Sequence, residues 1–299
     1  MASTPANSTK HALNLPENEA VIVVSGKDSP GLVAAITKAI ADLGGNILSL
    51  AQHTDNPEGG HFFQRVVIKF EDLTARRTEI ESALDKVIVG DLGLEFTFSD
   101  RSVPKRVAIL ASTSDHCLLD LLWRNRRGEI PMVVPMVISN HSIVADDVRS
   151  FGIPFFHVPS SGPDKSAAEE EIVKLLKGNV DVVVLARYMQ ILSSDFLAKV
   201  GVPVINIHHS FLPAFIGAGP YQKAKERGVK LIGATGHYVT EDLDEGPIIE
   251  QDVVRVSHQD SAQDLQRRGA DVERLVLARA VTWHCEDRVI RNGRETIVL

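Results

Sequence analysis

The sequence predicts an α/β protein with two domains: a ferredoxin-like βαββαβ domain followed by a doubly wound, mostly parallel sheet. The chain has 299 residues, a length typical of two domains. Before residue 100, strand and helix patterns alternate in the order βαββαβ. After residue 105, apolar runs alternate with helical segments, and several runs are apolar nearly throughout, as in parallel strands covered on both faces.

The first domain is expected over residues 18–99, after a disordered tail at residues 1–17. Its helices follow from apolar residues at helical spacing, and its strands from short apolar or alternating runs bounded by turn residues. Strands are expected at 20–24, 47–53, 61–70 and 92–98, and helices at 32–43 and 74–89.

This segment resembles an ACT domain. The resemblance depends on the run Asp28-Ser29-Pro30-Gly31-Leu32-Val33, followed by Gly44-Gly45-Asn46-Ile47. It implies pairing with a second copy, and therefore a homodimer or homotetramer. It also implies an amino-acid effector site that includes Asp28, Ser29, Pro30, Gly31 and Asn46. A purely structural pairing module is the alternative.

The second domain is expected over residues 106–299, after a linker at residues 100–105. Strands are expected at 107–111, 132–138, 153–158, 180–186, 202–207, 231–239 and 248–256. Helices are expected near 116–127, 142–151, 166–177, 190–200 and 261–285. Asn292-Gly293 predicts a closing hairpin at 288–298.

Charge and cysteine content exclude several classes of function. The net charge is −7, and residues 1–100 hold 8 basic against 14 acidic side chains, whereas the remainder holds 24 against 25. Because neither part has a basic excess, we expect no nucleic-acid partner. No apolar run approaches the roughly 20 residues of a membrane span, so we expect no membrane association. Cys117 and Cys285 lie in apolar helical stretches, which indicates reduced, buried thiols and a cytoplasmic location.

The candidate site begins where the strand at 202–207 ends. Asn206 and His208 are two residues apart and point to the same face of an extended strand, whereas His209 is expected to point the other way. An acidic loop that contains Asp244 follows the strand at 231–239. An amide, an imidazole and a carboxylate in one cleft suit nucleophilic attack on a carbonyl. Taken singly, each residue also fits a structural cap or a solvated turn.

A wider set of residues resembles the signature of the folate-dependent formyltransferases. The set comprises Asn206-Ile207-His208, Ser210-Phe211-Leu212-Pro213, Phe215, Gly217, Gly233-Ala234-Thr235, His237 and Asp244-Glu245-Gly246-Pro247-Ile248-Ile249. The resemblance implies that Asn206, His208 and Asp244 are catalytic and that a folate is the substrate. It implies a substrate pocket formed by Met189, Gln190, Ile191, Leu192, Thr240, Glu241, Asp242 and His237. Plain core packing is the alternative for the apolar members.

We expect neither a metal nor a permanently bound cofactor. His208 and His209 are adjacent and diverge on a strand, and no second cluster has usable ligand spacing. Two departures from the family pattern are visible: Gly236 stands where alanine is expected, and Gly219 where lysine is expected. Gly236 is expected to loosen the strand beside the site.

Two features favour hydrolysis over formyl transfer. The loop at 111–117 contains no glycine and carries Asp115, unlike the phosphate-cradling loop of the glycinamide ribonucleotide transformylases. An ACT-like domain in front of a formyltransferase domain resembles the formyltetrahydrofolate deformylase family. The resemblance implies hydrolysis of 10-formyltetrahydrofolate to tetrahydrofolate and formate, which supplies purine synthesis and balances the one-carbon pool. Transfer to an amine acceptor and a non-catalytic folate sensor are the alternatives.

Overall fold

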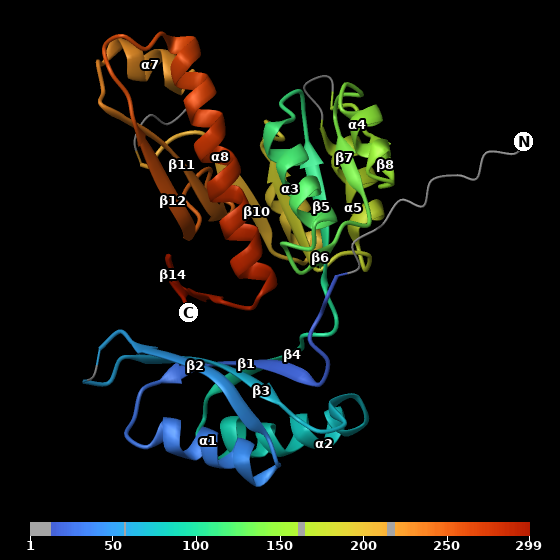
Figure 1. Ribbon diagram of the computed structural model, residues 1–299, viewed down its shortest axis with the longest axis vertical. Helices are drawn as coiled ribbons and strands as arrows, with labels where there is room; N and C mark the ends of the chain where they lie inside the picture. Colours follow the sequence, from blue (N-terminus) through green and yellow to red (C-terminus); the bar gives the residue numbers. More distant parts are fainter. Residues whose placement is uncertain (1–12, 57, 161–164, 214–218) are drawn as a thin grey trace, which may run out of the picture. The chain divides into compact units, whose positions relative to one another are not determined.

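The computed structural model describes residues 13–299 except 57, 161–164 and 214–218 (Figure 1). Most of the predicted tail, and Phe215 and Gly217 of the formyltransferase signature, therefore lie outside the described residues. Contacts divide the chain into two compact units, a larger one at Lys105–Thr282 and a smaller one formed by Leu15–Pro104 with Trp283–Leu299. None of the described helices combines the length and the apolar composition that a membrane span requires.

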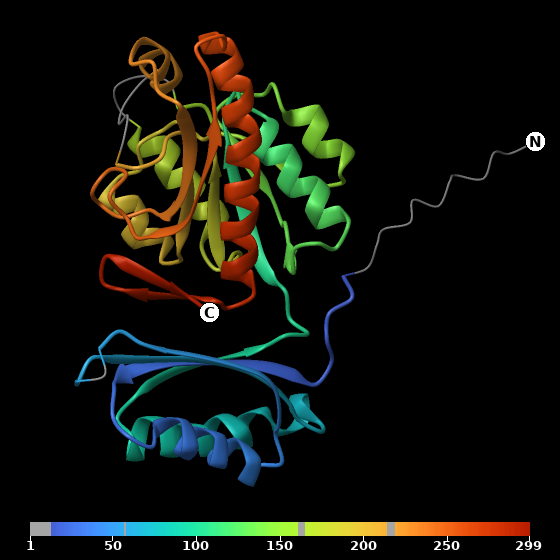
Figure 2. The ribbon, with the colours of Figure 1, turned by 60° about the vertical axis from the view of Figure 1, so that its left-hand side comes forward.

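The smaller unit contains an antiparallel sheet in the order β2-β3-β1-β4. Its strands are β1 (Glu19–Lys27), β2 (Asn46–Thr54), β3 (His61–Lys69) and β4 (Glu95–Asp100). Helices α1 (Leu32–Asp42) and α2 (Leu73–Asp85), with the π-helical turn η1 (Lys86–Asp91), cover one face (Figure 2). Ile36 and Ile80 of these helices are fully buried against Ile22 and Val66 of the sheet. The predicted βαββαβ order is confirmed.

The C-terminal hairpin, β13 (Val289–Asn292) and β14 (Glu295–Val298), groups with this smaller unit. The sequence predicts it in the second domain instead. The physical reason is Arg65 of β3, whose Nε and Nη2 donate to the carbonyls of Asp287 and Glu286 at 3.1 and 2.8 Å. Those carbonyls follow directly on the last helix, where backbone acceptors lack intrahelical partners. A long-range contact of this kind has no local signal in the sequence.

The larger unit contains a mixed sheet in the order β12-β11-β10-β9-β5-β7-β8, and β6 pairs with β5 beside it. The parallel strands are β5 (Lys105–Ala111), β6 (Met132–Val133), β7 (Val137–Ser139), β8 (Phe155–His157), β9 (Val182–Ala186) and β10 (Val204–His208). The strand predicted at 132–138 is divided into β6 and β7, because Pro135 cannot donate a ladder hydrogen bond. Strands β11 (Leu231–Tyr238) and β12 (Ile248–Arg255) are antiparallel.

Helices surround this sheet (Figure 1). They are α3 (His116–Arg126), α4 (Ala145–Ser150), α5 (Ser166–Leu176), α6 (Ser194–Val200), α7 (Pro220–Glu226) and α8 (Ala262–Cys285). Helix α6 begins later than predicted, because the Ser193 hydroxyl caps it by accepting from the Phe196 N–H at 3.0 Å. The residues before Ser193 are thereby released from the helix and line the site described below.

The two unusual glycines occupy specific places. Strand pairing shifts register between Gly236 and His237, and the expected loosening of the strand stays a prediction. A Cβ at Gly236 would lie 3.1 Å from the Cβ of Ala280, so helix α8 packs closely on this strand. Gly219 caps α7 with φ 66°, a left-handed conformation in which a lysine would be strained.

Candidate active site

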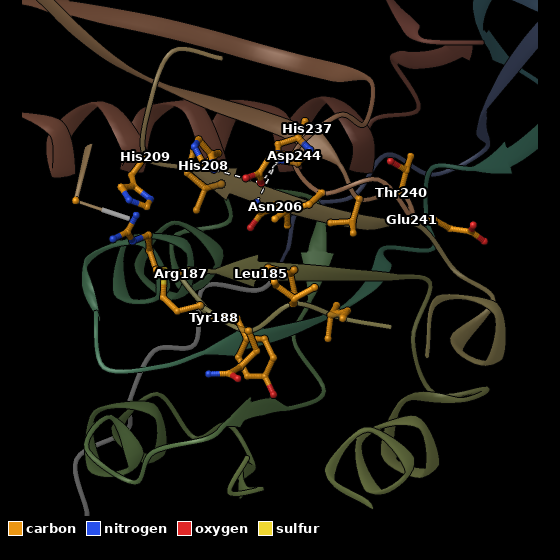
Figure 3. A pocket seen from close by; sticks show the side chains of 18 residues that line it. Leu185, Arg187, Tyr188, Asn206, His208, His209, His237, Thr240, Glu241 and Asp244 are labelled. Atoms are coloured by element: carbon orange, nitrogen blue, oxygen red, sulfur yellow. Dashed lines mark hydrogen bonds and ion pairs between the residues drawn. The ribbon is translucent and has the colours of Figure 1, made fainter. Parts of the chain in front are cut away.

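Asn206 and His208 share one face of β10 and line the same cavity (Figure 3). This confirms the expectation from their spacing on the strand. The cavity has a volume of about 350 Å³. The remaining wall of the cavity comes from the segment after β9 and from the loop after β11. The lining residues include Leu185, Arg187, Tyr188, Met189, Gln190, Ile191, Leu192, His209, Gly219, His237, Thr240, Glu241, Leu243 and Asp244.

Asp244 reaches His208 although its loop follows an antiparallel strand. Register pairs Ile205 with Tyr238, so β11 ends beside the start of β10 rather than beside His208. The loop then folds back, and Asp244 adopts φ 57°. Its Oδ1 lies 3.3 Å from Nδ1 of His208, and both side chains are nearly buried. The hydrogen bond from His208 lowers the pKa of Asp244 below its ordinary value, so the carboxylate is ionised.

His237 holds the amide of Asn206. Its Nδ1 lies 3.0 Å from the carbonyl oxygen of Tyr238, which can only accept, so Nδ1 carries the proton. Nε2 is then an acceptor for Nδ2 of Asn206, at 3.1 Å. Burial lowers the pKa of His237, which favours this neutral form. The arrangement leaves the second N–H of the Asn206 amide to donate to a ligand.

His209 differs from the sequence-based expectation. Strand β10 ends at His208, so the alternation of side chains stops there, and His209 lines the same cavity. Its ring lies 5.2 Å from that of His208. Burial, with a contribution from Arg187, lowers the pKa of His209 to about 4, so it is neutral near pH 7. The expectation that His209 points away was wrong.

The predicted folate residues divide into two groups. Met189, Gln190, Ile191 and Leu192 line one wall of the cavity, and Thr240 and Glu241 line another. Met189 and Ile191 are 58% and 64% exposed, so core packing does not account for them. Asp242 is absent from the described lining, and its carbonyl instead accepts a hydrogen bond from the Thr240 hydroxyl at 3.2 Å.

A buried cluster around Glu273 of α8 was missed from the sequence. Glu273 is 2% exposed and accepts hydrogen bonds from Tyr221 at 2.5 Å and from Nε2 of His116 at 2.8 Å. Arg187 approaches it at 3.5 Å. Burial alone would raise the pKa of Glu273, but these partners lower it to about 2. The available signal was a glutamate at a position that helical spacing assigns to the buried face.

The comparisons with known proteins agree with this geometry. The sequence model of the formyl transferase family matches residues 105–281, and that of the ACT domain matches residues 20–85. The formyltetrahydrofolate deformylase of Mycobacterium tuberculosis is 59% identical over 91% of this chain and 87% of its own. The chain belongs to the formyltetrahydrofolate deformylase family.

Solved structures show the same relationship. The formyltetrahydrofolate deformylase from Pseudomonas syringae pv. tomato matches with a TM-score of 0.89 and 43% identity, over 95% of each chain. A glycinamide ribonucleotide transformylase from Symbiobacterium toebii matches with a TM-score of 0.62 and 34% identity, over 66% of this chain. The deformylase family thus shares both units with this chain.

In the ACT domain of this family member, the predicted effector residues lie at a turn and at a strand end. Asp28 accepts a hydrogen bond from the Thr54 hydroxyl at 2.8 Å. Gly31, with φ 92°, caps the N-terminus of α1, and Asn46 begins β2. The turn leaves backbone N–H groups of α1 available, and the effector role stays a prediction.

One group of side chains has metal-ligand character among the described residues. Atoms of His116, Cys117 and Glu273 lie within 4.8 Å of one another. Burial raises the pKa of the Cys117 thiol well above its ordinary value, and a metal requires the thiolate. Glu273 is already hydrogen-bonded and lies beside the Arg187 cation. These donors fit a hydrogen-bonded cluster better than a metal site.

Proposed function

We propose that this chain hydrolyses 10-formyltetrahydrofolate to tetrahydrofolate and formate. The observation that carries the proposal is the convergence of Asn206, His208 and Asp244 in one cavity, in a chain that matches named deformylases along 91% of its length. The released formate would supply purine synthesis, and the reaction would balance the one-carbon pool.

The formyl oxygen is bound by two donors. Nδ1 of His208 donates to Asp244, and its Nε2 is buried with no hydrogen-bond partner among the described residues. When both ring nitrogens of His208 carry a proton, Nε2–H donates to the formyl oxygen. The remaining N–H of Asn206 is the second donor. Donors fixed in this way stabilise the negative charge that develops on the oxygen during attack.

Asp244 orients and activates the water. Its carboxylate has several acceptor directions, so it can bond to His208 and also to a water molecule. The water oxygen attacks the formyl carbon, and the water gives a proton to Asp244. This addition forms a tetrahedral intermediate at the formyl carbon. The bond between carbon and N10 then breaks, N10 takes that proton, and the formic acid that leaves ionises to formate. Asn206 and His208 hold the oxyanion throughout.

The decisive experiment measures formate release from 10-formyltetrahydrofolate in the absence of any amine acceptor. We expect one formate per tetrahydrofolate, and a loss of turnover on the order of 100–1000-fold in Asp244→Asn and in His208→Ala. Glu245→Gln, a change at an exposed neighbour in the same loop, is the matched control and should retain turnover. The absence of formate release by the native chain would contradict hydrolysis, as would near-normal turnover in Asp244→Asn.

The same assay separates the two alternatives. A formyltransferase would give a formylated amine faster than formate when an amine is supplied, and a folate sensor would give neither product. We also propose that the reaction needs no metal and no bound cofactor, because side chains supply the required donors and base. Dialysis against a chelator should therefore leave the rate unchanged.

The ACT domain supports a further part of the proposal. We propose that two copies of the chain associate through it, as a homodimer or homotetramer, with an amino-acid effector near Asp28, Ser29, Pro30, Gly31 and Asn46. Sedimentation of the native chain tests the association, and rates measured with each amino acid test the effector. A cytoplasmic location stays a prediction from the two reduced cysteines.

A further inference from the structure

Arg187 has an unusual conformation at the cavity wall. It follows directly on β9 and adopts φ 61°, a left-handed conformation that is strained for a non-glycine residue. Its side chain is 13% exposed, and its guanidinium lies beside His209 in the cavity (Figure 3). The fold therefore keeps a nearly buried cation beside His209, in a strained backbone conformation.

The guanidinium has hydrogen-bonding capacity that the described residues do not use. Glu273 is its neighbouring anion, but Nε is 3.5 Å from Oε2. Tyr221 and His116 take the hydrogen bonds to the two carboxylate oxygens. Nε and Nη1 of Arg187 are buried with no hydrogen-bond partner among the described residues. An unpartnered buried donor is unfavourable, and more so when it is charged, so the site favours a ligand that can accept.

These donors lie close to His208. Arg187, His208 and His209 line the same cavity, and the rings of the two histidines are 5.2 Å apart. A neutral His209 can contribute one further N–H donor. A ligand held here lies next to His208, the group proposed to bind the formyl oxygen, and an anion with acceptor oxygens matches these donors.

We infer that Arg187 and His209 form a subsite for a small carboxylate, namely the formate that leaves His208 after hydrolysis. The inference depends on the proposed function, because hydrolysis converts a neutral formyl amide into this anion beside the subsite. Hydrogen bonds between ionised partners are the stronger kind, so the guanidinium favours the carboxylate product over the uncharged formyl group. Glu273, through its contact with Arg187, is a positioning residue for the subsite.

Inhibition by added formate tests the subsite. We expect formate to inhibit the native chain, and its inhibition constant to rise about 10-fold or more in Arg187→Gln, since a hydrogen bond to a charged group contributes roughly 1.5–3 kcal/mol. Arg187→Lys, which keeps the charge, should show a smaller rise. Arg274→Gln is the matched control, because Arg274 lies next to Glu273 in sequence, is partly exposed and pairs with Asp271. An unchanged inhibition constant in Arg187→Gln would overturn the inference.

Two further measurements keep the outcome unambiguous. Line broadening of ¹³C-formate in the presence of the chain reports binding without turnover, so the subsite can be present even if hydrolysis is disproved. Removal of Arg187 leaves Glu273 buried with a missing partner, so Arg187→Gln can lose its fold. The double variant Arg187→Gln, Glu273→Gln removes both charges and should show the same loss of formate binding.

A carboxylate of the substrate itself is the competing ligand. If Arg187 held the glutamate tail of the folate, Arg187→Gln would raise KM for 10-formyltetrahydrofolate and leave KM unchanged for 10-formyltetrahydropteroate, which lacks that tail. That split would overturn the formate subsite. Equal KM changes for the two substrates, together with weaker inhibition by formate, support it.

Discussion

At the scale of single residues, the proposed catalytic geometry depends on side chains that do not themselves contact the formyl group in that proposal. Rotation about the Cβ–Cγ bond of Asn206 would exchange its amide oxygen and nitrogen, and the contact between Nδ2 and Nε2 of His237 fixes which N–H faces the cavity. His237 is fixed in turn by the carbonyl of Tyr238. The orientation of the Asn206 N–H, the proposed oxyanion donor, thus depends on the buried His237.

Replacement of His237 tests this dependence. We expect His237→Phe to lower kcat about 10-fold or more with little change in KM. Misplacing the Asn206 donor weakens its hydrogen bond to the oxyanion of the transition state more than its hydrogen bond to the neutral bound substrate. Steady-state kinetics on 10-formyltetrahydrofolate measure the effect. His237→Gln, which retains an acceptor oxygen for Asn206, should recover part of kcat. Equal kcat values in the native chain and in His237→Phe would disprove the positioning role.

Glu273 makes a pH-dependent contribution to stability. Its pKa falls from the ordinary 4.5 to about 2 in the folded chain. Between these values the unfolded chain binds a proton at this side chain and the folded chain does not, so stability is lost as the pH falls. The full contribution, on the order of 3 kcal/mol, is present above about pH 4.5.

Unfolding in urea at several pH values tests this contribution. The difference in unfolding free energy between the native chain and Glu273→Gln should shrink by about 2 kcal/mol between pH 6 and pH 3. Glu245→Gln, at an exposed site, should show no comparable trend. A difference that stays constant over this range would show that Glu273 does not titrate as described.

At the scale of elements, the loop between β11 and β12 determines where the Asp244 carboxylate, the proposed base, lies. Gly246 permits its return, because the position of a Cβ there would be 1.7 Å from the carbonyl oxygen of Tyr238. Backbone atoms cannot yield as a flexible side chain can. The close approach of the two chain segments brings Asp244 back over the sheet to His208.

Gly246→Ala is therefore expected to displace Asp244. We expect kcat to fall by about 100-fold, the usual effect of a shift of about 1 Å in a catalytic group, as measured by formate release. Gly90→Ala is the control, because a Cβ at Gly90 would meet only one backbone oxygen, at 4.0 Å. Full activity in Gly246→Ala would show that the loop tolerates a wider turn.

The elements also show how far the sequence alone leads. Alternation along β10 placed Asn206 and His208 on one face, and apolar spacing identified α8 and the parallel strands. Local patterns carry no information on strand direction, so the return of Asp244 across the antiparallel β11 was not predictable. The pairing of Arg187 with Glu273 joins residues 86 positions apart and depends on how α8 packs on the sheet.

At the scale of the whole molecule, the smaller unit is built from both ends of the described chain. Arg65 joins the two segments, because its guanidinium donates to the carbonyls of Glu286 and Asp287 just before the hairpin. Burial lowers the pKa of Arg65, yet the guanidinium stays charged, since its ordinary pKa is far above neutrality.

Loss of Arg65 should therefore release the hairpin alone. We expect Arg65→Ala to speed amide hydrogen exchange in Val289–Asn292 and Glu295–Val298, while exchange in β5, β9 and β10 is unchanged. Mass spectrometry of peptic fragments measures both. Arg77→Ala, which removes a helix-surface ion pair in the same unit, is the control. Uniform acceleration in both units would mean that Arg65 supports more than the hairpin.

Helix α8 begins in the larger unit and ends in the smaller one, and residues near 104 provide the other crossing between them. Because the chain passes between the units at two places, a single truncation cannot separate them. A polypeptide that starts at Lys105 would retain the hairpin without Arg65, the side chain that anchors it. Isolation of the larger unit therefore requires removal of a segment from each end of the chain. The C-terminal truncation must fall within α8, the helix that also carries Glu273.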